Sequence, residues 1–305
     1  MSELPVRGIC PVLETPFQPD GRLDLDGFHS MLSHVLAQRV GSVMFPAFAS
    51  EFSKLSDAER DLMVRELLSQ TNPRQDVQAI ISVSNASTYA AIEAATAAIE
   101  SGADAVNLLP IFAVRPSPAA ATRHIRDVVA AIAPVPVVVQ YAPELTGIQI
   151  AADELCRIAG DHPNLCMVKV EAVPPGPVIS QLATRPVPLP AVVGYAGIQM
   201  IDAHERGAVG VQPGSSFVEI YQRIWELLEA GSAPEARALH QRLLPYLTYW
   251  MSSVDLIVAA EKAISQRRGL IRSDHCRRPA RELDEHESSA VDAFLVDFAA
   301  ELNIK

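Results

Sequence analysis

A lysine lies near the end of an apolar run at residues 165–170, which reads Leu-Cys-Met-Val-Lys-Val. Such a run is typical of a buried strand, and a lysine is rarely buried without a partner or a chemical purpose. A desolvated amine has a lowered pKa and can attack a carbonyl carbon to form a Schiff base. The alternative is a strand-end lysine that reaches solvent or pairs with a carboxylate. Lys169 is therefore the first candidate for catalysis.

A carboxylate follows this lysine at the spacing of a strand. Side chains in a strand alternate between two faces, so Glu171 lies on the same side as Lys169 if the strand continues. Glu171 can then tune the amine or act as an acid or base, and the alternative is a salt bridge or a loop carboxylate. The three other lysines are weaker candidates by position: Lys54 in a loop, Lys262 in a predicted helix and Lys305 at the last residue.

The sequence around Lys169 alternates short apolar runs with helical patterns. Runs rich in Val, Ile and Leu, typical of strands covered on both faces, occur at residues 8–13, 42–45, 78–83, 105–109, 135–141, 165–170, 191–193 and 207–211. Eight strand–helix units within about 210 residues favour a (β/α)8 TIM barrel. The alternative is an open, doubly wound sheet, but the turn after the first strand lacks the Gly-rich phosphate loop of that fold.

Strand patterns stop after residue 211, and helical patterns follow at residues 217–230, 235–250, 254–268 and 288–302. We therefore expect residues 1–215 to form the barrel with the catalytic lysine, and residues 216–305 to form a C-terminal helical extension packed on it. Chemistry in such barrels lies at the carboxyl ends of the strands. The Gly-Tyr-Ala-Gly turn at 194–197 lies there and can point backbone N–H groups at an anion, so Gly194 is a candidate substrate contact.

The composition excludes several classes of protein. The net charge is −11, which argues against nucleic acid or an anionic membrane surface as a partner, and no apolar run is long enough to span a membrane. Four widely separated cysteines without a CxxC pair are typical of a reduced, cytoplasmic protein. The eight histidines include no HExxH motif and no ligand spacing, so we expect no metal, and no motif indicates a cofactor.

Several short motifs occur together along the chain. They are Gly-x-x-Pro-x-x-x-Thr-Pro-Phe at residues 8–17, Asp-Gly-x-x-Asp at 20–24, Glu-x-x-x-Leu-Ser-x-x-Glu-Arg at 51–60, Ala-x-x-x-Gly-Ala-Asp at 98–104 and Tyr-x-Pro-x-x-Thr-Gly at 141–147. With the Lys169 strand, they make the whole chain resemble the dihydrodipicolinate synthase / N-acetylneuraminate lyase superfamily. The resemblance implies a (β/α)8 barrel and a Schiff base between Lys169 and a 2-oxo acid such as pyruvate. It also implies a homotetramer, a dimer of dimers, and the apolar stretch at residues 108–112 suits an interface.

The chain departs from the family at positions that the resemblance marks as functional. A hydroxyl pair that holds the pyruvate carboxylate in relatives is replaced by Phe48 and Ala49, which leaves backbone N–H groups near Ser50, or its hydroxyl, for that role. The catalytic tyrosine aligns with Gln140, and Tyr141 follows one residue later. A one-residue offset turns a strand side chain to the other face, so Tyr141 can substitute only if a bulge re-aims it.

Two further departures make the expected site more apolar. A relay tyrosine that crosses a subunit boundary in the synthases aligns near Phe112, and an arginine that binds the semialdehyde carboxylate aligns with Leu145. The resemblance therefore implies that Phe48, Phe112 and Leu145 face the substrate. We do not expect a true dihydrodipicolinate synthase, and we expect the part of the substrate beyond the 2-oxo acid to be aromatic or aliphatic.

Three functions are compatible with these residues. The first is a Schiff-base lyase or aldolase, in which Lys169 attacks the keto carbon, Gln140 or Tyr141 orients the substrate, and Glu171 or water moves protons. The second is a dehydratase or deaminase of a deoxy-keto acid, which uses the same imine but loses water or ammonia. The third is a family member that has lost catalysis and only binds a 2-oxo acid.

Overall fold

Eight short parallel strands form a closed barrel in the computed structural model, which describes residues 4–111 and 114–304. The strands are β1 (Gly8–Ile9), β2 (Ser42–Phe45), β3 (Gln78–Val83), β4 (Ala105–Leu108), β5 (Val137–Tyr141), β6 (Leu165–Val170), β7 (Ala191–Val193) and β8 (Gly210–Val211). They pair in the order β1-β8-β7-β6-β5-β4-β3-β2. The ends of that order meet where Met44 N donates to Pro11 O at 3.0 Å and Leu13 N donates to Met44 O at 2.9 Å. The predicted TIM barrel is therefore confirmed.

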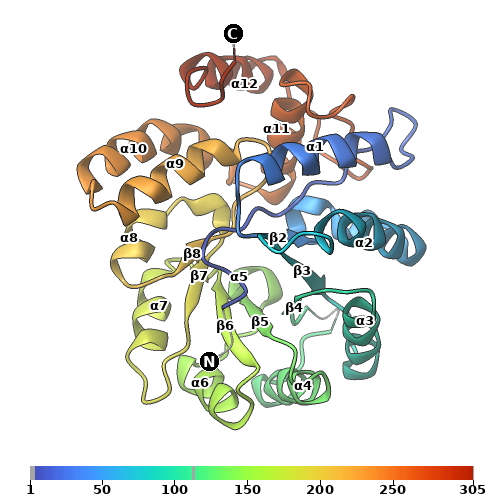
Figure 1. The fold of residues 1–305 in the computed structure, drawn as a ribbon, viewed down its shortest axis with the longest axis vertical. Helices are drawn as coiled ribbons and strands as arrows, with labels where there is room; N and C mark the ends of the chain where they lie inside the picture. The colour runs from blue at the N-terminus through green and yellow to red at the C-terminus, as the bar shows by residue number, and fades with distance from the viewer. Residues whose placement is uncertain (1–3, 112–113, 305) are drawn as a thin grey trace.

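Helices between the strands surround the barrel (Figure 1). They are α1 (Leu25–Ala37), α2 (Asp57–Thr71), α3 (Thr88–Glu100), α4 (Pro118–Ala131), α5 (Pro143–Thr146), α6 (Ala152–Asp161), α7 (Gly176–Ala183) and α8 (Met200–Glu205). Local capping chemistry determines where several of them begin. Ser56 and Glu59 form a reciprocal capping box at the start of α2, and the Asp24 side chain accepts from Gly27 N at the start of α1.

Four helices follow the last strand: α9 (Val218–Glu229), α10 (Ala233–Trp250), α11 (Val254–Arg267) and α12 (Glu285–Asp297). Figure 1 shows α10, α11 and α12 grouped at one side of the molecule, next to α1 and α9. Phe294 packs between Phe217 and Trp250, at ring-centre distances of 5.0 and 5.3 Å. The last helix begins three residues earlier than the predicted range 288–302 because Asp284 and Glu287 form a capping box. No helix among the described residues is both long and apolar enough to cross a bilayer.

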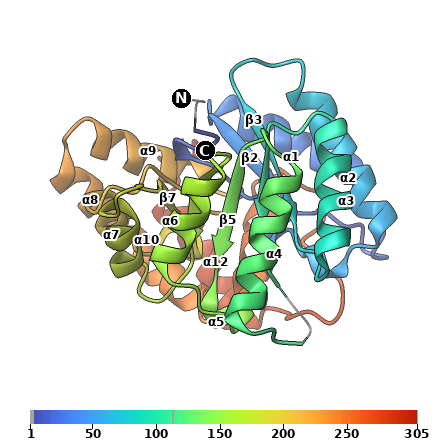
Figure 2. The same ribbon diagram turned by 90° about the horizontal axis from the view of Figure 1, so that it is seen from below.

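The barrel interior is apolar at one level and polar at the next. Ile80, Ala105, Val138 and Met167 point inward from four successive strands and are fully buried. Two residues further along each strand come Ser82, Asn107, Gln140 and Lys169, which are also buried. Because strand side chains repeat every two residues, both levels face the interior. Figure 2 shows the arrow of β5 pointing toward α5, so the polar level lies toward the carboxyl ends of the strands, where α5 follows β5.

The apolar stretch at residues 108–112 does not form a surface patch. Leu108 and Leu109 are 0% and 1% exposed within a single chain, and Pro110 is also buried. Phe112 lies outside the described residues. The expectation that this stretch covers a subunit interface is wrong for its buried part, because the barrel and its helices already cover these side chains. The buried residues of this stretch therefore give the predicted homotetramer no support.

Candidate active site

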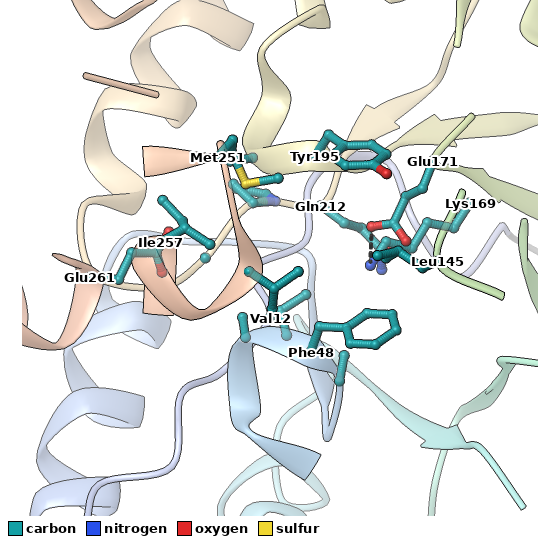
Figure 3. Close-up of a pocket in the computed structure, with 16 residues that line it drawn as sticks. Val12, Phe48, Leu145, Lys169, Glu171, Tyr195, Gln212, Met251, Ile257 and Glu261 are labelled. Carbon is teal, nitrogen blue, oxygen red and sulfur yellow. Dashed lines mark ion pairs between the residues drawn. The ribbon is translucent and has the colours of Figure 1, made fainter. Parts of the chain in front are cut away.

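Lys169 and Glu171 form a buried pair at the carboxyl end of β6. Lys169 is 3% exposed, and its Nζ lies 3.2 Å from Oε1 of Glu171. Glu171 is the first residue after the strand, and its backbone N–H donates to Tyr141 O at 2.8 Å, which continues the parallel pairing by one residue. The two side chains therefore share one side, as the period of two requires. Figure 3 shows the pair at one end of a pocket.

A row of hydrogen bonds across four strands orients Glu171. The register places Ser82 beside Asn107, and Gln140 beside Lys169. Asn107 Nδ2 donates to Ser82 Oγ at 2.8 Å and to Gln140 Oε1 at 2.9 Å, and Gln140 Nε2 donates to Glu171 Oε2 at 2.6 Å. These donors fix the amide orientation of Gln140 and direct the other carboxylate oxygen toward Lys169.

The row places Gln140 in contact with Glu171. Gln140 is fully buried and does not line the pocket, so its contacts are with Asn107 and Glu171. Asn107 itself was missed by the sequence reasoning. A polar residue within the apolar run at residues 105–109 is the signal that could have found it.

Gly194 lies beside this carboxylate. A Cβ atom at position 194 would lie 2.3 Å from Glu171 Oε1, closer than any real contact allows. The glycine therefore makes room for Glu171 at the end of β7. The structure gives it this packing role beside the pair, whereas the sequence predicted a substrate contact through its backbone.

The pocket lies between the barrel and the C-terminal helices, and about 560 Å³ of space there, part of it open to solvent, is not filled by atoms. Three of the predicted residues, Phe48, Ala49 and Leu145, line it together with Lys169 and Glu171. Its remaining walls come from the segments that follow β1, β2, β7 and β8, from the end of α10 and from helix α11: Val12, Ala47, Tyr195, Ala196, Gln212, Pro213, Gly214, Met251, Val254, Ile257 and Glu261. Figure 3 shows Val12 and Phe48 on one side, Met251 on the other, and Glu261 at the end away from Lys169. Apart from Gln212, the labelled side chains between these two ends that line the middle of the pocket are mostly apolar.

Four predicted site residues do not line this pocket: Gln140 and Gly194, described above, and Tyr141 and Ser50. Tyr141 points away from Lys169 and packs on the core outside the barrel, near the backbone of Ile150. The register shift in the β5–β6 pair lies at Val137 and Val138, too early to re-aim it. Phe112 lies outside the described residues.

Ser50 is the fourth. It is fully buried, and its hydroxyl donates to Leu13 O and accepts from Ala47 N at 3.0 Å. The hydroxyl therefore holds the loop after β2 against the loop after β1. Its neighbours Phe48 and Ala49 thereby line the pocket. The Ser50 hydroxyl itself is occupied by these two backbone contacts and does not face the pocket, contrary to the expected ligand role.

Two titratable residues of the pocket escaped the sequence reasoning. Tyr195 belongs to the Gly-Tyr-Ala-Gly turn after β7, and Glu261 belongs to α11, in the segment that the sequence treated as an extension. Burial, with a contribution from the nearby Glu14, raises the pKa of Glu261 from 4.5 to about 8. Burial similarly raises the pKa of Glu14 to about 7. Both carboxyls thus hold a proton far above the pH at which an exposed glutamate loses it.

A second buried ion pair fastens the pocket wall to the C-terminal helices. Lys262 on α11 is fully buried, donates to Glu51 Oε1 and to His275 O, and lies 4.3 Å from the ring centre of Phe17. Glu51 follows the 3-10 turn that carries Phe48 and Ala49 and also accepts from Lys54 at 2.9 Å. The turn is therefore anchored to α11. Among the described residues, no cluster of three His, Cys, Asp or Glu side chains is arranged to hold a metal ion.

The fold and the site define a (β/α)8-barrel protein with a buried lysine–carboxylate pair at the carboxyl end of its sixth strand. Residues 5–297 match the model of the Dihydrodipicolinate synthetase family. The chain belongs to this family, whose members are lyases. The resemblance stated from the motifs is thus confirmed.

Individual relatives differ in the reaction that their names state. The chain is 27% identical over 300 residues to 4-hydroxy-tetrahydrodipicolinate synthase 1 of Streptomyces coelicolor, which covers 97% of this chain and 94% of the relative. It is 28% identical over 286 residues to L-2-keto-3-deoxyarabonate dehydratase of Azospirillum brasilense. That match covers 91% of this chain and 89% of the relative. A solved Pseudomonas aeruginosa protein, proposed to be a dihydrodipicolinate synthetase, superposes with a TM-score of 0.88 at 27% identity, over 97% of this chain and 99% of that one.

Proposed function

We propose that this protein is a Schiff-base-forming lyase or aldolase that acts on a 2-oxo acid of the pyruvate type. The observation that carries the proposal is the buried contact of 3.2 Å between Lys169 Nζ and Glu171 Oε1 at the end of the pocket. A buried lysine whose counter-ion can accept its proton becomes a nucleophile when a carbonyl displaces water from the site. Among the residues that line the pocket, Lys169 and Glu171 form an ion pair only with each other. No further ion pair there gives them a purely structural role.

The proposed reaction begins with a proton transfer within the pair. Glu171 takes a proton from the Lys169 ammonium, and the neutral amine adds to the keto carbon of the 2-oxo acid. Loss of water from the resulting carbinolamine forms an iminium ion, which accepts the electron pair when the bond between the third and fourth carbons breaks. Gln140 keeps Glu171 aimed at the amine through the 2.6 Å hydrogen bond.

Covalent trapping tests this assignment. Incubation with pyruvate and borohydride is expected to add the mass of a reduced pyruvyl group to Lys169 alone, and Lys169→Ala is expected to abolish the addition. Lys262 is the matched control, because it is equally buried but lies outside the pocket. Labelling of Lys54 or Lys262, or of no lysine with any 2-oxo acid tried, would overturn the Schiff-base assignment.

A dehydratase is the second candidate. The Azospirillum relative is named as a dehydratase of a 2-keto-3-deoxy acid, and the same imine at Lys169 serves that reaction. Product analysis after incubation with 2-keto-3-deoxy acids separates the two: an aldehyde and pyruvate indicate a lyase, whereas loss of one water indicates a dehydratase. Binding without turnover of any of these acids would indicate instead the third candidate, a protein that only binds them.

The pocket walls support a proposal about the part of the substrate beyond the 2-oxo acid. Leu145 lines the pocket where the resemblance places a carboxylate-binding arginine, and Phe48 lines it where relatives have a hydroxyl. This supports a substrate other than that of a true dihydrodipicolinate synthase, with an aromatic or aliphatic group beyond the 2-oxo acid.

The assembly is proposed from the resemblance, as a homotetramer of two dimers working in the cytoplasm. Light scattering of the purified protein at micromolar concentration checks the assembly, and a monomer would contradict it.

A further inference from the structure

The turn after β7 has a strained backbone. Tyr195, Ala196 and Gly197 follow one another with φ values of 49°, 48° and 68°, all in the left-handed region. Only Gly197 occupies that region without a steric cost, so two of the three residues oppose their own conformational preference. Such strain persists only where the surrounding structure enforces it, and it concentrates at functional sites.

Buried side chains from the C-terminal helices enforce this turn. Tyr221 on α9 is fully buried, and its hydroxyl donates to Ala196 O at 2.8 Å. His240 on α10 is 4% exposed, and its Nε2 lies 3.0 Å from Gly197 O. Burial lowers the pKa of His240, so the ring is neutral and donates one N–H to that carbonyl. Two helices thus each contribute a buried polar side chain to hold one strained turn.

The strained turn presents the side chain of Tyr195 to the pocket. Tyr195 is partly buried and lines the same pocket as Lys169 and Glu171. Figure 3 shows its hydroxyl directed toward the side on which Glu171 lies. Burial, together with the charges of Glu171 and Glu144, raises the pKa of its phenol, so the hydroxyl holds its proton at neutral pH. Among the residues that line this pocket, Tyr195 is the one with a phenol.

We propose that Tyr195 is the proton-transfer residue of this site. The inference rests on the proposed Schiff-base function and names a residue for the proton transfer that the sequence analysis assigned to Glu171 or water. The Gln140 amide donates to Glu171, and Tyr141 faces away from the pocket. Neither side chain is therefore placed to transfer a proton to a substrate there.

In the proposed role, Tyr195 gives up one proton and takes one back. The Tyr195 hydroxyl donates its proton to the departing hydroxyl of the carbinolamine, the C–O bond breaks, and water and the iminium ion form. The phenolate then removes a proton from the third carbon, whose C–H electrons form a C=C bond while the C=N electron pair moves to nitrogen. The product is a neutral enamine, and the phenol is restored. In cleavage of an aldol adduct, the phenolate instead takes the proton of the hydroxyl on the fourth carbon.

Hydrogen exchange of pyruvate tests this role without knowledge of the aldehyde. In heavy water, the wild-type protein is expected to replace the methyl protons of pyruvate with deuterium, which proton NMR follows over time. Tyr195→Phe keeps the ring but removes the hydroxyl, and we expect exchange to fall by about 10² to 10⁴-fold, the range for loss of a general acid–base group. Tyr141→Phe removes a hydroxyl outside the pocket and is expected to change exchange by less than about twofold on the same scale.

Borohydride trapping separates failure of this inference from failure of the proposed function. Trapping of Lys169 in Tyr195→Phe, given enough time, with slow exchange supports both. If Lys169 is trapped in this variant and exchange stays within about threefold of the wild-type rate, the role of Tyr195 is overturned, because loss of an acid–base group lowers the rate far more. No trapping in the wild-type protein overturns the Schiff-base function itself. Tyr195→Leu is the second variant, and it must show the same loss of exchange if Tyr195→Phe folds poorly by circular dichroism.

Discussion

The amide of Gln140 connects two buried side chains: its Oε1 accepts from Asn107 at 2.9 Å, and its Nε2 donates to Glu171 at 2.6 Å. Gln140 stands where the resemblance places a catalytic tyrosine. In this chain the position therefore serves to orient the carboxylate beside Lys169.

Gln140→Met tests that orientation. Methionine has a similar size, but it removes one of the two acceptors of Asn107 Nδ2 and the amide donor of Glu171 Oε2. We expect a loss of roughly 1–3 kcal/mol in the free energy of unfolding, the cost of leaving buried polar groups unpaired. Trapping of Lys169 should also slow, because Glu171 is no longer held. Urea unfolding and the rate of mass addition measure the two effects, and an unchanged trapping rate would show that Glu171 needs no support from Gln140.

Lys262→Met tests the ion pair that anchors the pocket wall. Removing the ammonium leaves the buried Glu51 with Lys54 and the backbone N–H of Arg277 as its remaining partners. Because Lys54 still pairs with Glu51, we expect a loss of roughly 1–3 kcal/mol in the free energy of unfolding, the range for a buried polar group that loses a partner. Arg272→Met, which breaks an exposed pair with Asp26, is the control and should cause no measurable change. Equal effects of the two variants would contradict the anchoring role.

The raised pKa of Glu261 predicts a fall in stability with rising pH. The unfolded chain releases this proton near pH 4.5, whereas the folded chain keeps it until about pH 8. Between these values the folded state binds more protons, so the free energy of unfolding decreases as pH rises through the window and levels off above it. Glu14, with its pKa raised to about 7, adds a fall of the same sign.

Glu261→Gln removes one titration and is expected to raise the melting temperature at pH 8 relative to the wild-type protein, with little difference near pH 4.5. Thermal unfolding across this range measures the effect, with the exposed Glu235→Gln as the matched control. A melting temperature that stays flat in the wild-type protein from pH 5 to pH 8 would show that Glu261 does not titrate as described.

The apolar pocket wall predicts which aldehyde the enzyme prefers. We expect a higher kcat/KM with an aromatic or alkyl aldehyde than with a polyhydroxylated one, because Phe48 and Leu145 gain from covering apolar surface and leave hydroxyl groups without partners. Phe48→Ala should reduce the preference by roughly tenfold, since the lost ring contact is worth ~1–2 kcal/mol. A clear preference for the polyhydroxylated aldehyde would contradict this interpretation and leave the role of Lys169 unchanged.

The sequence by itself determined the barrel and its lysine, because both depend on short-range periodicity. Buried parallel strands read as apolar runs, so eight runs of that kind predicted eight strands, and the position of Lys169 within one of them predicted its burial. The spacing of two residues likewise predicted that Glu171 lies beside it. The same periodicity predicted that Tyr141 faces away from Lys169, and in the structure it packs on the core outside the barrel.

Only the tertiary structure decided what else faces the lysine. The hydrogen bonds of Gln140 join strands whose register no local pattern specifies, and Tyr195 reaches the pocket through a left-handed turn that Tyr221 and His240 hold from distant helices. Glu261 lies more than 90 residues after Lys169, yet it lines the same pocket because α11 packs over the carboxyl ends of the strands. Local sequence fixes which face of an element a side chain occupies, whereas the partners on that face are brought there by the packing of the whole chain.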